Sequence, residues 1–423
     1  MELRIDRLLN ELRSRTAEVL AAIDHDPLLR KREIGELVLA NATKELFTPL
    51  ETHHLFAKGI VYRRGPYQLI SIPLLKIYNL GEKLITVRDL EELAAPEKDG
   101  IAPRLNFLRK YDGSMIQRFQ HGGRVWYSTR GILEGMSIFD ADSGDEAPAF
   151  SHFDYLGAAR RIAERDYPVA NECAPAFDGL TLIFELIHPD ARIITDYGDR
   201  EDLILIAVFD CRRWGYLTYV ELIDFSHRHG FTVVDAFSPA GLTLAEQLDN
   251  LLATIAGTDQ EGTVLTIEHG PELVYRVKSK SPDYLKLMRL MVHCNYGATV
   301  DMLDTFPVRP TWPEFEVFLR AQGTDKVPEE VLALYQQYHD QFTAYLGDVE
   351  RLREWAIAMC ATVKAAIVEA DSRVFRKAFA EKAKAQPHAA LLFTALDGRL
   401  DLTRVRQYAA TPEEVAEALK RLD

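Results

Sequence analysis

Residues 106–131 read NFLRKYDGSMIQRFQHGGRVWYSTRG, and this stretch decides how the middle of the chain folds. Two runs rich in β-branched and aromatic residues flank His121-Gly122-Gly123, which predicts an antiparallel hairpin. A second hairpin is predicted around His269-Gly270-Pro271. Short β-rich runs separated by turn residues extend from about residue 55 to about residue 295: GIVYRRGPYQLISIP, TLIFELI, ARIITDY, LILIAVFD, FTVVDAF, GTVLTI and ELVYRVK. The central part of the chain is therefore expected to be antiparallel sheet.

Helical patterns lie on both sides of this β-rich region and once within it. Apolar residues at helical spacing predict an amphipathic helical segment over residues 1–45. Thr243 and Glu246 form a capping-box pattern, which predicts a helix over the apolar positions that follow. After the proline-rich stretch 306–313, apolar residues over 331–352 recur at steps of four and three, which predicts a long helix.

These patterns predict an α+β fold with antiparallel sheets, flanking helices and an all-helical C-terminal domain. The expected parts are a helical segment over residues 1–45, a mixed domain over 46–296 and a helical domain over 297–423. Neither an internal repeat nor a low-complexity tract is visible in the sequence.

Composition and charge exclude several classes of protein. The 423 residues are 47% hydrophobic, which excludes a disordered chain or a miniprotein. The formal charge of −14 argues against a general basic surface for nucleic acid, so any such contact must be local. The four cysteines stand singly, which favours a reducing, cytoplasmic compartment. No membrane span or signal-peptide core is expected, and no protein partner is indicated.

The pentapeptide Lys110-Tyr111-Asp112-Gly113-Ser114 has the KxDG form of a lysine that transfers nucleotides. An amine attacks phosphorus only when it is deprotonated, so such a lysine needs neighbouring cations that lower its pKa and a tight glycine turn that exposes it. A charged turn at the end of a strand is the alternative interpretation of these residues.

Two charged residues that follow in the chain fit the same chemistry. Arg130 ends the second strand of the first hairpin, so it returns close to Lys110 and is suited to holding a phosphate. Glu185 lies within the apolar run TLIFELI, where an unpaired carboxylate is costly and needs a partner such as a ribose hydroxyl or a cation. A structural salt bridge is an equally good interpretation of Glu185.

Two strand motifs complete the set. Glu261 precedes Gly262 in EGTV, which lets a nucleotide or a hydrated metal ion approach the backbone. Lys278 and Lys280 are two residues apart in one strand and so share a face, where they repel each other unless an anion lies between them. A solvated edge strand would also tolerate this pair.

Taken in order, KYDGS, STRG, FELI, EGTV and KSK followed by Tyr284 resemble the ATP-dependent RNA ligases of the covalent nucleotidyltransferase superfamily. The run IPLLKIYNLGE at 72–82 resembles an upstream element of the bacteriophage RNA ligase 1 family, which favours that family. The similarity covers roughly residues 45–290 and implies a nucleotidyltransferase (adenylyltransferase) domain.

Carried over to this chain, the resemblance makes Lys110 the nucleophile that is adenylylated. It implies that Lys278, Lys280 and Glu261 take part in catalysis, and that Glu261 and Glu185 lie close to a divalent metal ion. Mg²⁺ suits carboxylates and phosphates, and Mn²⁺ is a possible substitute. The residues implied to bind ATP are Lys76, Tyr78, Asp112, Gly113, Arg130, Glu185, Phe209, Glu261, Lys278, Lys280 and Tyr284.

Three positions are less clear than the others. Phe209 resembles an adenine-stacking position, although any strand core would also favour a phenylalanine there. Lys58 stands where the family often has arginine, which keeps the charge but loses the bidentate fork, so Lys58 is only a possible phosphate contact. Ile77 replaces an aromatic residue of the upstream element, which weakens the case for stacking at that position.

The expected activity is the joining of 3′-hydroxyl and 5′-phosphate RNA ends through a lysyl-AMP intermediate, in RNA repair, with tRNA as a possible substrate. The helical C-terminal domain is expected to help select the RNA, and its basic stretch over 373–384 is either a backbone contact or a charged helix face. The alternatives are a DNA ligase, an enzyme that only adenylylates 5′ ends, or a non-catalytic RNA-binding protein.

Other sites are weakly indicated by the sequence. No GxxxxGK[ST] loop is present, so no P-loop kinase is fused to the chain. His53-His54 and His227-Arg228-His229 lack further partners at ligand spacing, which favours solvated surface over a metal site for both.

Overall fold

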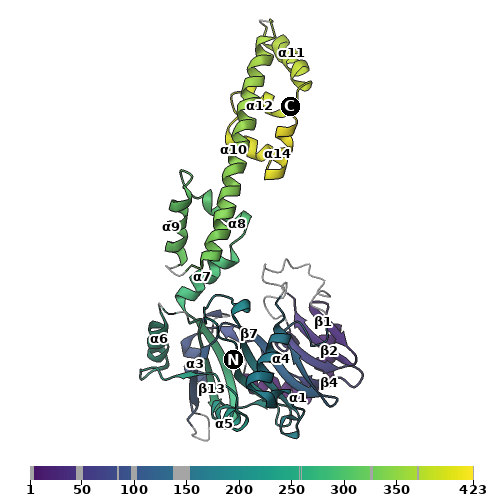
Figure 1. The fold of residues 1–423 in the computed structure, drawn as a ribbon, viewed down its shortest axis with the longest axis vertical. Coiled ribbons are helices and arrows are strands. Elements are labelled where there is room, and N and C mark those ends of the chain that lie inside the picture. Colours follow the sequence, from purple (N-terminus) through teal and green to yellow (C-terminus); the bar gives the residue numbers. More distant parts are fainter. Residues whose placement is uncertain are drawn as a thin grey trace. The chain divides into compact units, whose positions relative to one another are not determined.

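The computed structural model describes residues 4–43, 51–82, 85–96, 102–136, 153–256, 258, 260–323, 327–368 and 371–422. The chain divides into two compact units, Met1–Leu285 and Lys286–Asp423 (Figure 1). The first unit contains three sheets with flanking helices. In the described part of the second unit all regular structure is helical.

The three sheets of the first unit are almost entirely antiparallel, and β5–β14 is the one parallel pairing among the described strands. The N-terminal sheet has the order β1 (Leu29–Ile34), β2 (Leu37–Ala42), β3 (Lys58–Arg63), β4 (Gln68–Ser71). The second sheet has the order β11 (Gly215–Tyr216), β10 (Asp202–Asp210), β9 (Leu180–Ile187), β7 (Ser114–His121), β8 (Arg124–Ser128). The third has the order β12 (Ala236–Phe237), β6 (Arg104–Lys110), β13 (Gly262–His269), β14 (Glu272–Lys280), β5 (Tyr78–Asn79).

Helices cover these sheets and connect their strands. The α-helices of the first unit are α1 (Ile5–Ser14), α2 (Thr16–His25), α3 (Val87–Leu93), α4 (Tyr155–Asp166), α5 (Tyr219–His229) and α6 (Leu244–Ile255). Short 3-10 helices are η1 (Thr52–Leu55), η4 (Pro168–Asn171), η5 (Pro175–Phe177) and η6 (Pro189–Ala191). The helix α7 (Pro282–Val292) begins at the end of the first unit and continues into the second.

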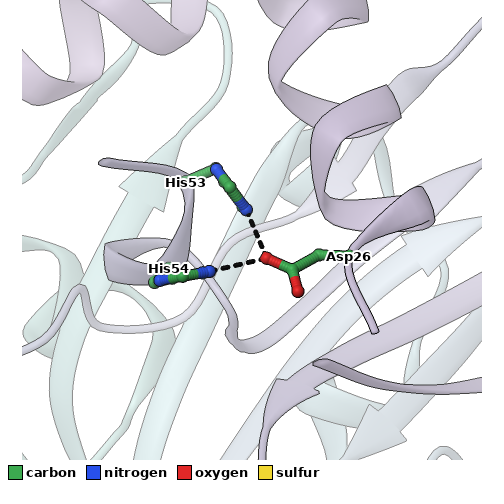
Figure 2. A group of neighbouring side chains, drawn as sticks. All are labelled: Asp26, His53 and His54. Atoms are coloured by element: carbon green, nitrogen blue, oxygen red, sulfur yellow. Dashed lines mark hydrogen bonds and ion pairs between the residues drawn. The ribbon is translucent and has the colours of Figure 1, made fainter. Parts of the chain in front are cut away.

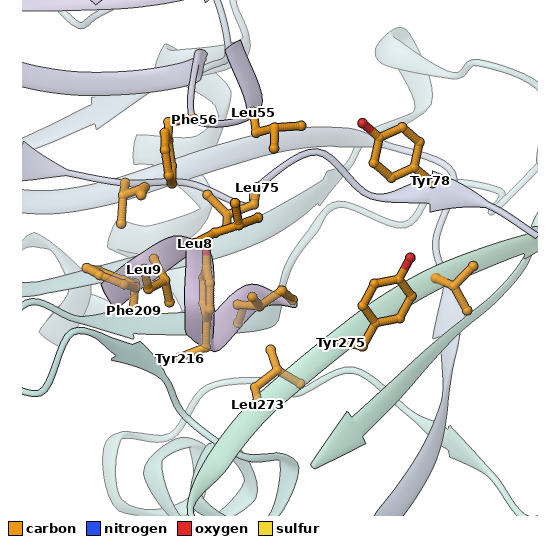
Figure 3. Packing of buried hydrophobic residues seen from close by; sticks show 14 of the residues in the cluster. Leu8, Leu9, Leu55, Phe56, Leu75, Tyr78, Phe209, Tyr216, Leu273 and Tyr275 are labelled. Atoms are coloured by element: carbon orange, nitrogen blue, oxygen red, sulfur yellow. The ribbon is translucent and has the colours of Figure 1, made fainter. Parts of the chain in front are cut away.

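Two large hydrophobic cores hold the first unit together. One joins the N-terminal helices to all three sheets: Leu8 and Leu9 of α1 lie close to Phe209 and Tyr216 of the second sheet, and Leu273 of the third sheet belongs to the same cluster (Figure 3). The other core packs α4 and α5 against the second sheet. Because the N-terminal helices bury Leu9 and Leu12 completely or nearly so, they belong to the folded unit rather than to a separate arm.

The helix α10 (Glu329–Ala365) runs through the second unit, with α8 (Tyr296–Leu303) and α9 (Trp312–Gly323) beside its first half (Figure 1). The helices beside its second half are α11 (Ser372–Lys384), α12 (Ala389–Leu396), α13 (Leu402–Tyr408) and α14 (Pro412–Lys420). The predicted apolar stripe of α10 is buried at Tyr335, Phe342 and Leu352, as a helix with one packed face requires. None of the described helices is both long and apolar enough to cross a membrane.

The predicted α+β class, with antiparallel sheets, flanking helices and a helical C-terminal region, is confirmed. Both predicted hairpins form, as β7–β8 and β13–β14, and α6 begins at Thr243 with the expected capping box. The four cysteines are free in the structure.

Two local predictions are wrong. Helix was expected throughout residues 1–45, but residues 29–42 form the hairpin β1–β2, which turns at Gly35 with a φ of 58°. The run ARIITDY was expected to be a strand, but residues 192–197 form a loop. Its backbone N–H groups at Ile194 and Thr195 donate to the Asp112 carboxylate at 2.8 Å, and this side-chain partner replaces a strand ladder.

Candidate active site

A cavity of about 280 Å³ lies between the second and third sheets. Its walls come from strands that are far apart in sequence but adjacent in the fold. β6 and β13 contribute Leu108 and Val264, and β7 and β10 contribute Met115 and Ile206. The complete lining is Lys58, Leu74, Leu75, Lys76, Ile77, Leu108, Arg109, Lys110, Tyr111, Met115, Arg130, Glu185, Ile206, Val234, Val264, Arg276 and Lys278.

The charge of this lining is strongly one-sided. It contains seven basic side chains and a single carboxylate, that of Glu185. The remaining walls are largely aliphatic, so the cavity offers cations and apolar surface together. Such a lining suits a ligand that has both anionic groups and a planar apolar part.

Lys110 ends β6, and its backbone pairs with Gly262 of β13. Its Nζ donates to Glu261 Oε2 at 2.5 Å. Burial favours the neutral amine, but the Glu261 and Glu185 carboxylates outweigh burial and raise the pKa of Lys110 above its ordinary value. The expectation that neighbouring cations lower the pKa of Lys110 is therefore wrong for the ligand-free protein. The charged groups that dominate around its amine are carboxylates, not cations.

Glu261 is 2% exposed and lies between two ammonium groups. Its Oε1 is 2.9 Å from Lys280 Nζ, while its Oε2 accepts from Lys110. Removing either lysine would leave a buried carboxylate with half of its compensation. The carboxylate therefore fixes both lysines on either side of Gly262, where the strands β6, β13 and β14 pair.

Glu185 lies on β9 and its Oε1 accepts the backbone N–H of Gly113 at 3.1 Å. Burial raises the pKa of Glu185 to about 7, opposed by the positive charge of Lys110. The Gly113 backbone is so close to β9 that a Cβ at this position would lie 2.3 Å from the Leu186 carbonyl oxygen. A glycine is therefore required here for the turn to dock on β9.

Asp112 does not line the cavity but anchors the turn that presents Lys110. Its Oδ2 accepts the backbone N–H groups of Ile194 and Thr195, and its Oδ1 accepts the Tyr284 hydroxyl at 2.7 Å. The Lys280 ammonium in turn lies 4.7 Å from the centre of the Tyr284 ring. Asp112 and Tyr284 thus position the lysines instead of facing the cavity.

Four further cations surround the same space. Burial first, and then neighbouring cations, lower the pKa of Lys58 and of Lys278 to about 8. Arg130 is hydrogen-bonded to Asn41 at 3.1 Å, and burial lowers its pKa. Lys76 forms an ion pair with Glu82 at 3.3 Å. Lys58, only a possible contact from the sequence, is thus brought to the cavity beside Arg130.

Phe209 and Tyr78, two of the three aromatic residues predicted to bind ATP, lie outside the cavity. Phe209 is fully buried in the core, 5.2 Å from the Tyr216 ring, and the residue of β10 that reaches the cavity is Ile206, at a bulge in the strand. Tyr78 points into the hydrophobic core (Figure 3) and lines a separate small cavity. Neither ring lines the cavity beside Lys110, because each is buried in the core cluster around the N-terminal helices.

Glu185 and Glu261 are the two carboxylates beside Lys110, so they are the residues that would hold a divalent metal ion. Magnesium commonly takes one or two carboxylates and completes its shell with phosphate oxygens and water, so this donor set fits the expected metal. Among the described residues, a cluster of three metal-ligand side chains occurs only at Asp26, His53 and His54.

The cluster of Asp26, His53 and His54 is a hydrogen-bonded group (Figure 2). Both imidazole Nε2 atoms lie on one oxygen of Asp26, at 2.7 and 2.6 Å. His54 Nδ1 accepts the Glu51 backbone N–H, so its Nε2 carries the proton and is not free for a metal. The interpretation of His53-His54 as solvated surface is also wrong, since His54 is 2% exposed.

Sequence reasoning missed two charged residues of the cavity, Arg109, which directly precedes Lys110, and Arg276. Arg276 lies on β14 two residues before Lys278, and residues two apart in a strand share a face. The alternation Arg276, Lys278, Lys280 in ELVYRVKSK was therefore the available signal.

No family model matches the chain. The chain is 31% identical over 178 residues to a Thermovibrio ammonificans protein named putative RNA ligase, covering 42% of this chain and 39% of that protein. It is 24% identical over 315 residues to a protein named RNA ligase from Rhodothermus phage RM378, covering 64% and 70%. The matched region is thus about two fifths of the first relative's length, and both names agree with the resemblance to RNA ligases.

Solved ligase structures share low sequence identity with the chain. An archaeal ATP-dependent RNA ligase gives a TM-score of 0.45 at 13% identity, covering 79% of this chain and 82% of that one. A putative ATP-dependent DNA ligase from Aquifex aeolicus gives 0.39 at 15% identity, covering 82% and 80%. A Naegleria gruberi RNA ligase variant with ATP and Mn gives 0.35 at 16% identity, covering 48% and 54%.

Proposed function

We propose that this protein is an ATP-dependent RNA ligase that joins 3′-hydroxyl and 5′-phosphate RNA ends through a lysyl-AMP intermediate, in RNA repair. The observation that carries the proposal is the position of Lys110, whose amine lines a cation-rich cavity. The names of the two sequence relatives support RNA as the substrate class. We also propose a cytoplasmic location, where ATP is present and free cysteines persist.

In the first step, Lys110 Nζ attacks the α-phosphorus of ATP. The new N–P bond forms as the bond to the pyrophosphate oxygen breaks, and pyrophosphate leaves with that electron pair. Before attack the ammonium group must lose a proton, and Glu261, which accepts the hydrogen bond from Lys110, is the carboxylate placed to take it. The neutral amine must then turn from Glu261 to the α-phosphorus, and the lone pair released by deprotonation forms the N–P bond.

Negative charge builds on phosphate oxygens in every step. In the second step the 5′-phosphate of an RNA end takes the AMP from Lys110, and in the third a 3′-hydroxyl attacks that activated phosphate and expels AMP. Lys278, Lys280 and Arg130 supply fixed positive charge beside Lys110 throughout. Mg²⁺, or Mn²⁺ in its place, would neutralise further phosphate charge beside Glu261 and Glu185.

The direct test is the intact mass of the purified protein with and without ATP and Mg²⁺ or Mn²⁺, followed by peptide mapping. We expect one added AMP, located on Lys110. Sealing assays with matched RNA and DNA strands bearing 3′-hydroxyl and 5′-phosphate ends should then favour RNA. The absence of an adduct with either metal would refute the nucleotidyltransferase proposal, and preferential sealing of DNA would refute RNA as the substrate.

ATP affinity is expected to decrease as the pH rises through about 8. Lys58 and Lys278 are charged below their pKa of about 8 and lose that charge above it. For each lysine that must be charged, affinity at about pH 9 should be about ten-fold weaker than at about pH 7. Arginine stays charged in this range, so Lys58→Arg should weaken the dependence when ATP is titrated at both pH values. An identical slope in the two proteins would exclude Lys58 from the phosphate contact.

The second unit is proposed to select the RNA, which includes tRNA as a candidate. Its helix α11 carries the exposed cations Arg373, Arg376, Lys377, Lys382 and Lys384. Five cations and one Glu on this helix would attract the phosphate backbone of RNA. The contrast with the rest of the chain is marked, because the whole chain has a formal charge of −14.

Truncation after Val292 is expected to spare adenylylation and to change which RNAs are sealed. The truncated chain keeps the whole first unit and α7, hence every residue that lines the cavity. Adduct formation should stay within about three-fold of the full chain, and RNA affinity should fall by ten-fold or more at moderate salt. Sealing of a panel that includes tRNA anticodon-loop nicks and linear RNAs measures the selectivity. Equal sealing of every RNA by both proteins would refute a role for the second unit.

A further inference from the structure

Arg276 is a buried guanidinium that lines the cavity of Lys110 and is not explained by the chemistry at the phosphates. It is 9% exposed, and it forms no ion pair with any carboxylate of the described residues. Its guanidinium carbon lies 4.4 Å from the centre of the Tyr216 ring, which is itself buried. The nearby buried Glu268 carboxylate also favours the charged guanidinium, but none of the hydrogen bonds of the described residues joins Arg276 to a carboxylate. The guanidinium lines the cavity, so a bound ligand can accept hydrogen bonds from it.

The register of the third sheet places Arg276 at the far end of the cavity from the reacting amine. Gly262 of β13 lies between Lys110 and Lys280, Val264 lies between Leu108 and Lys278, and Thr266 lies opposite Arg276. Each step of two residues along a strand is about 7 Å, so Arg276 is about 7 Å beyond Lys278 and about 13 Å beyond Lys280. The phosphate-binding lysines and Arg276 thus mark opposite ends of one row.

The surface between these two ends is apolar. Leu108 and Val264 face Met115 and Ile206 across the cavity, so they form a slot between the second and third sheets. A nucleotide whose α-phosphate lies at Lys110 and Lys278 would place its planar base in this slot. The edge of the base would then face Arg276, which has donors and no acceptors.

We propose that Arg276 recognises the purine base of the bound nucleotide by donating hydrogen bonds to its ring nitrogens. This inference rests on the proposed function, because it assumes that the α-phosphate lies at Lys110. In this arrangement three residues of β14 contact different parts of the nucleotide: Lys280 and Lys278 contact phosphates, and Arg276 contacts the base. The Tyr216 ring holds the guanidinium plane in place from the other side.

The test compares the binding of ATP and of inorganic tripolyphosphate to the full chain and to Arg276→Met. Methionine keeps the length of the side chain and removes the donors. ATP affinity should fall by at least about ten-fold, because charge-assisted hydrogen bonds are lost, while tripolyphosphate affinity should stay within two-fold. Lys278→Met should weaken both ligands, since it removes a phosphate contact.

The controls separate the base contact from a structural role. Arg124→Met also removes a guanidinium from an aromatic ring, 4.2 Å from Trp126, but lies outside the cavity and should leave ATP affinity unchanged. If Arg276→Met does not fold, Arg276→Lys keeps the charge and should still lose ATP affinity while it keeps tripolyphosphate affinity. Equal losses for both ligands would make Arg276 structural or a phosphate contact and would overturn the inference.

Two further outcomes distinguish this inference from the proposed function. If the wild-type chain binds no ATP and gains no AMP, the proposed function itself fails. If the wild-type chain is adenylylated and the Arg276 variants bind ATP as tightly as it does, only the inference about the base fails. A loss for ATP but not for 2′-deoxy-ATP would place the contact on the ribose and would also overturn it.

Discussion

Lys110→Ala is expected to abolish the AMP adduct entirely, while the fold is kept. The variant removes the amine that both lines the cavity and donates to Glu261, so the N–P bond cannot form. Labelling by α-labelled ATP should fall below detection, which is a decrease of at least about 10⁴-fold for loss of a covalent nucleophile. Sealing of strands that are already adenylylated at the 5′ end should persist at a reduced rate, since that step does not need the Lys110 amine.

The fold of this variant should be kept because Glu261 retains Lys280 as a partner at 2.9 Å. The free energy of unfolding, measured by thermal denaturation, should decrease modestly, by about 1–3 kcal/mol, because the buried Glu261 carboxylate loses one of its two lysine partners. Lys377→Ala is the matched control, because Lys377 is an exposed lysine of α11. Normal labelling of Lys110→Ala would refute the assignment, and lost labelling in both variants would point to damaged protein.

The sequence predicted those parts of the fold in which local patterns and tertiary packing agree. The hairpins β7–β8 and β13–β14 form where glycine turns separate apolar alternation, and α6 starts at its capping box. In residues 29–42 the patterns conflicted, because a charged run LRKREI reads as the exposed continuation of a helix. Pairing with β3 turned that run and the next one into an N-terminal sheet, and such long-range pairing is not visible in local periodicity.

For the candidate site, the sequence named residues but could not assign their partners. Lys110, Glu185, Lys278 and Arg130 all line one cavity, although they come from separate segments. Their mutual distances were not available, so the pairing of Lys110 with Glu261, which reverses the expected pKa shift, was missed. For Phe209 the strand was predicted correctly, but the direction of the side chain was not. The bulge near Ile206 changes which side chains of β10 face the cavity.

Glu261→Gln is expected to slow adenylylation on the order of a hundred-fold, or about 3 kcal/mol. The change keeps the size of the side chain but leaves Lys110 and Lys280 facing each other without the carboxylate between them. It also removes one of the two carboxylates that would hold a divalent metal ion beside the α-phosphate. The rate of adduct formation should be measured by intact mass over a Mg²⁺ titration, in which the variant should need more metal.

The opposite result is physically possible, which makes Glu261 informative. Glu261 raises the pKa of Lys110, so its removal alone would increase the fraction of neutral amine and speed the attack. Faster or unchanged labelling of Glu261→Gln would therefore mean that Glu261 only holds Lys110 in its protonated form. The matched control is Glu134→Gln, since the Glu134 carboxylate accepts from Arg160 at 2.8 Å and does not line the cavity. A hundred-fold loss confined to Glu261→Gln would show that phosphate and metal chemistry outweighs the gain in neutral amine.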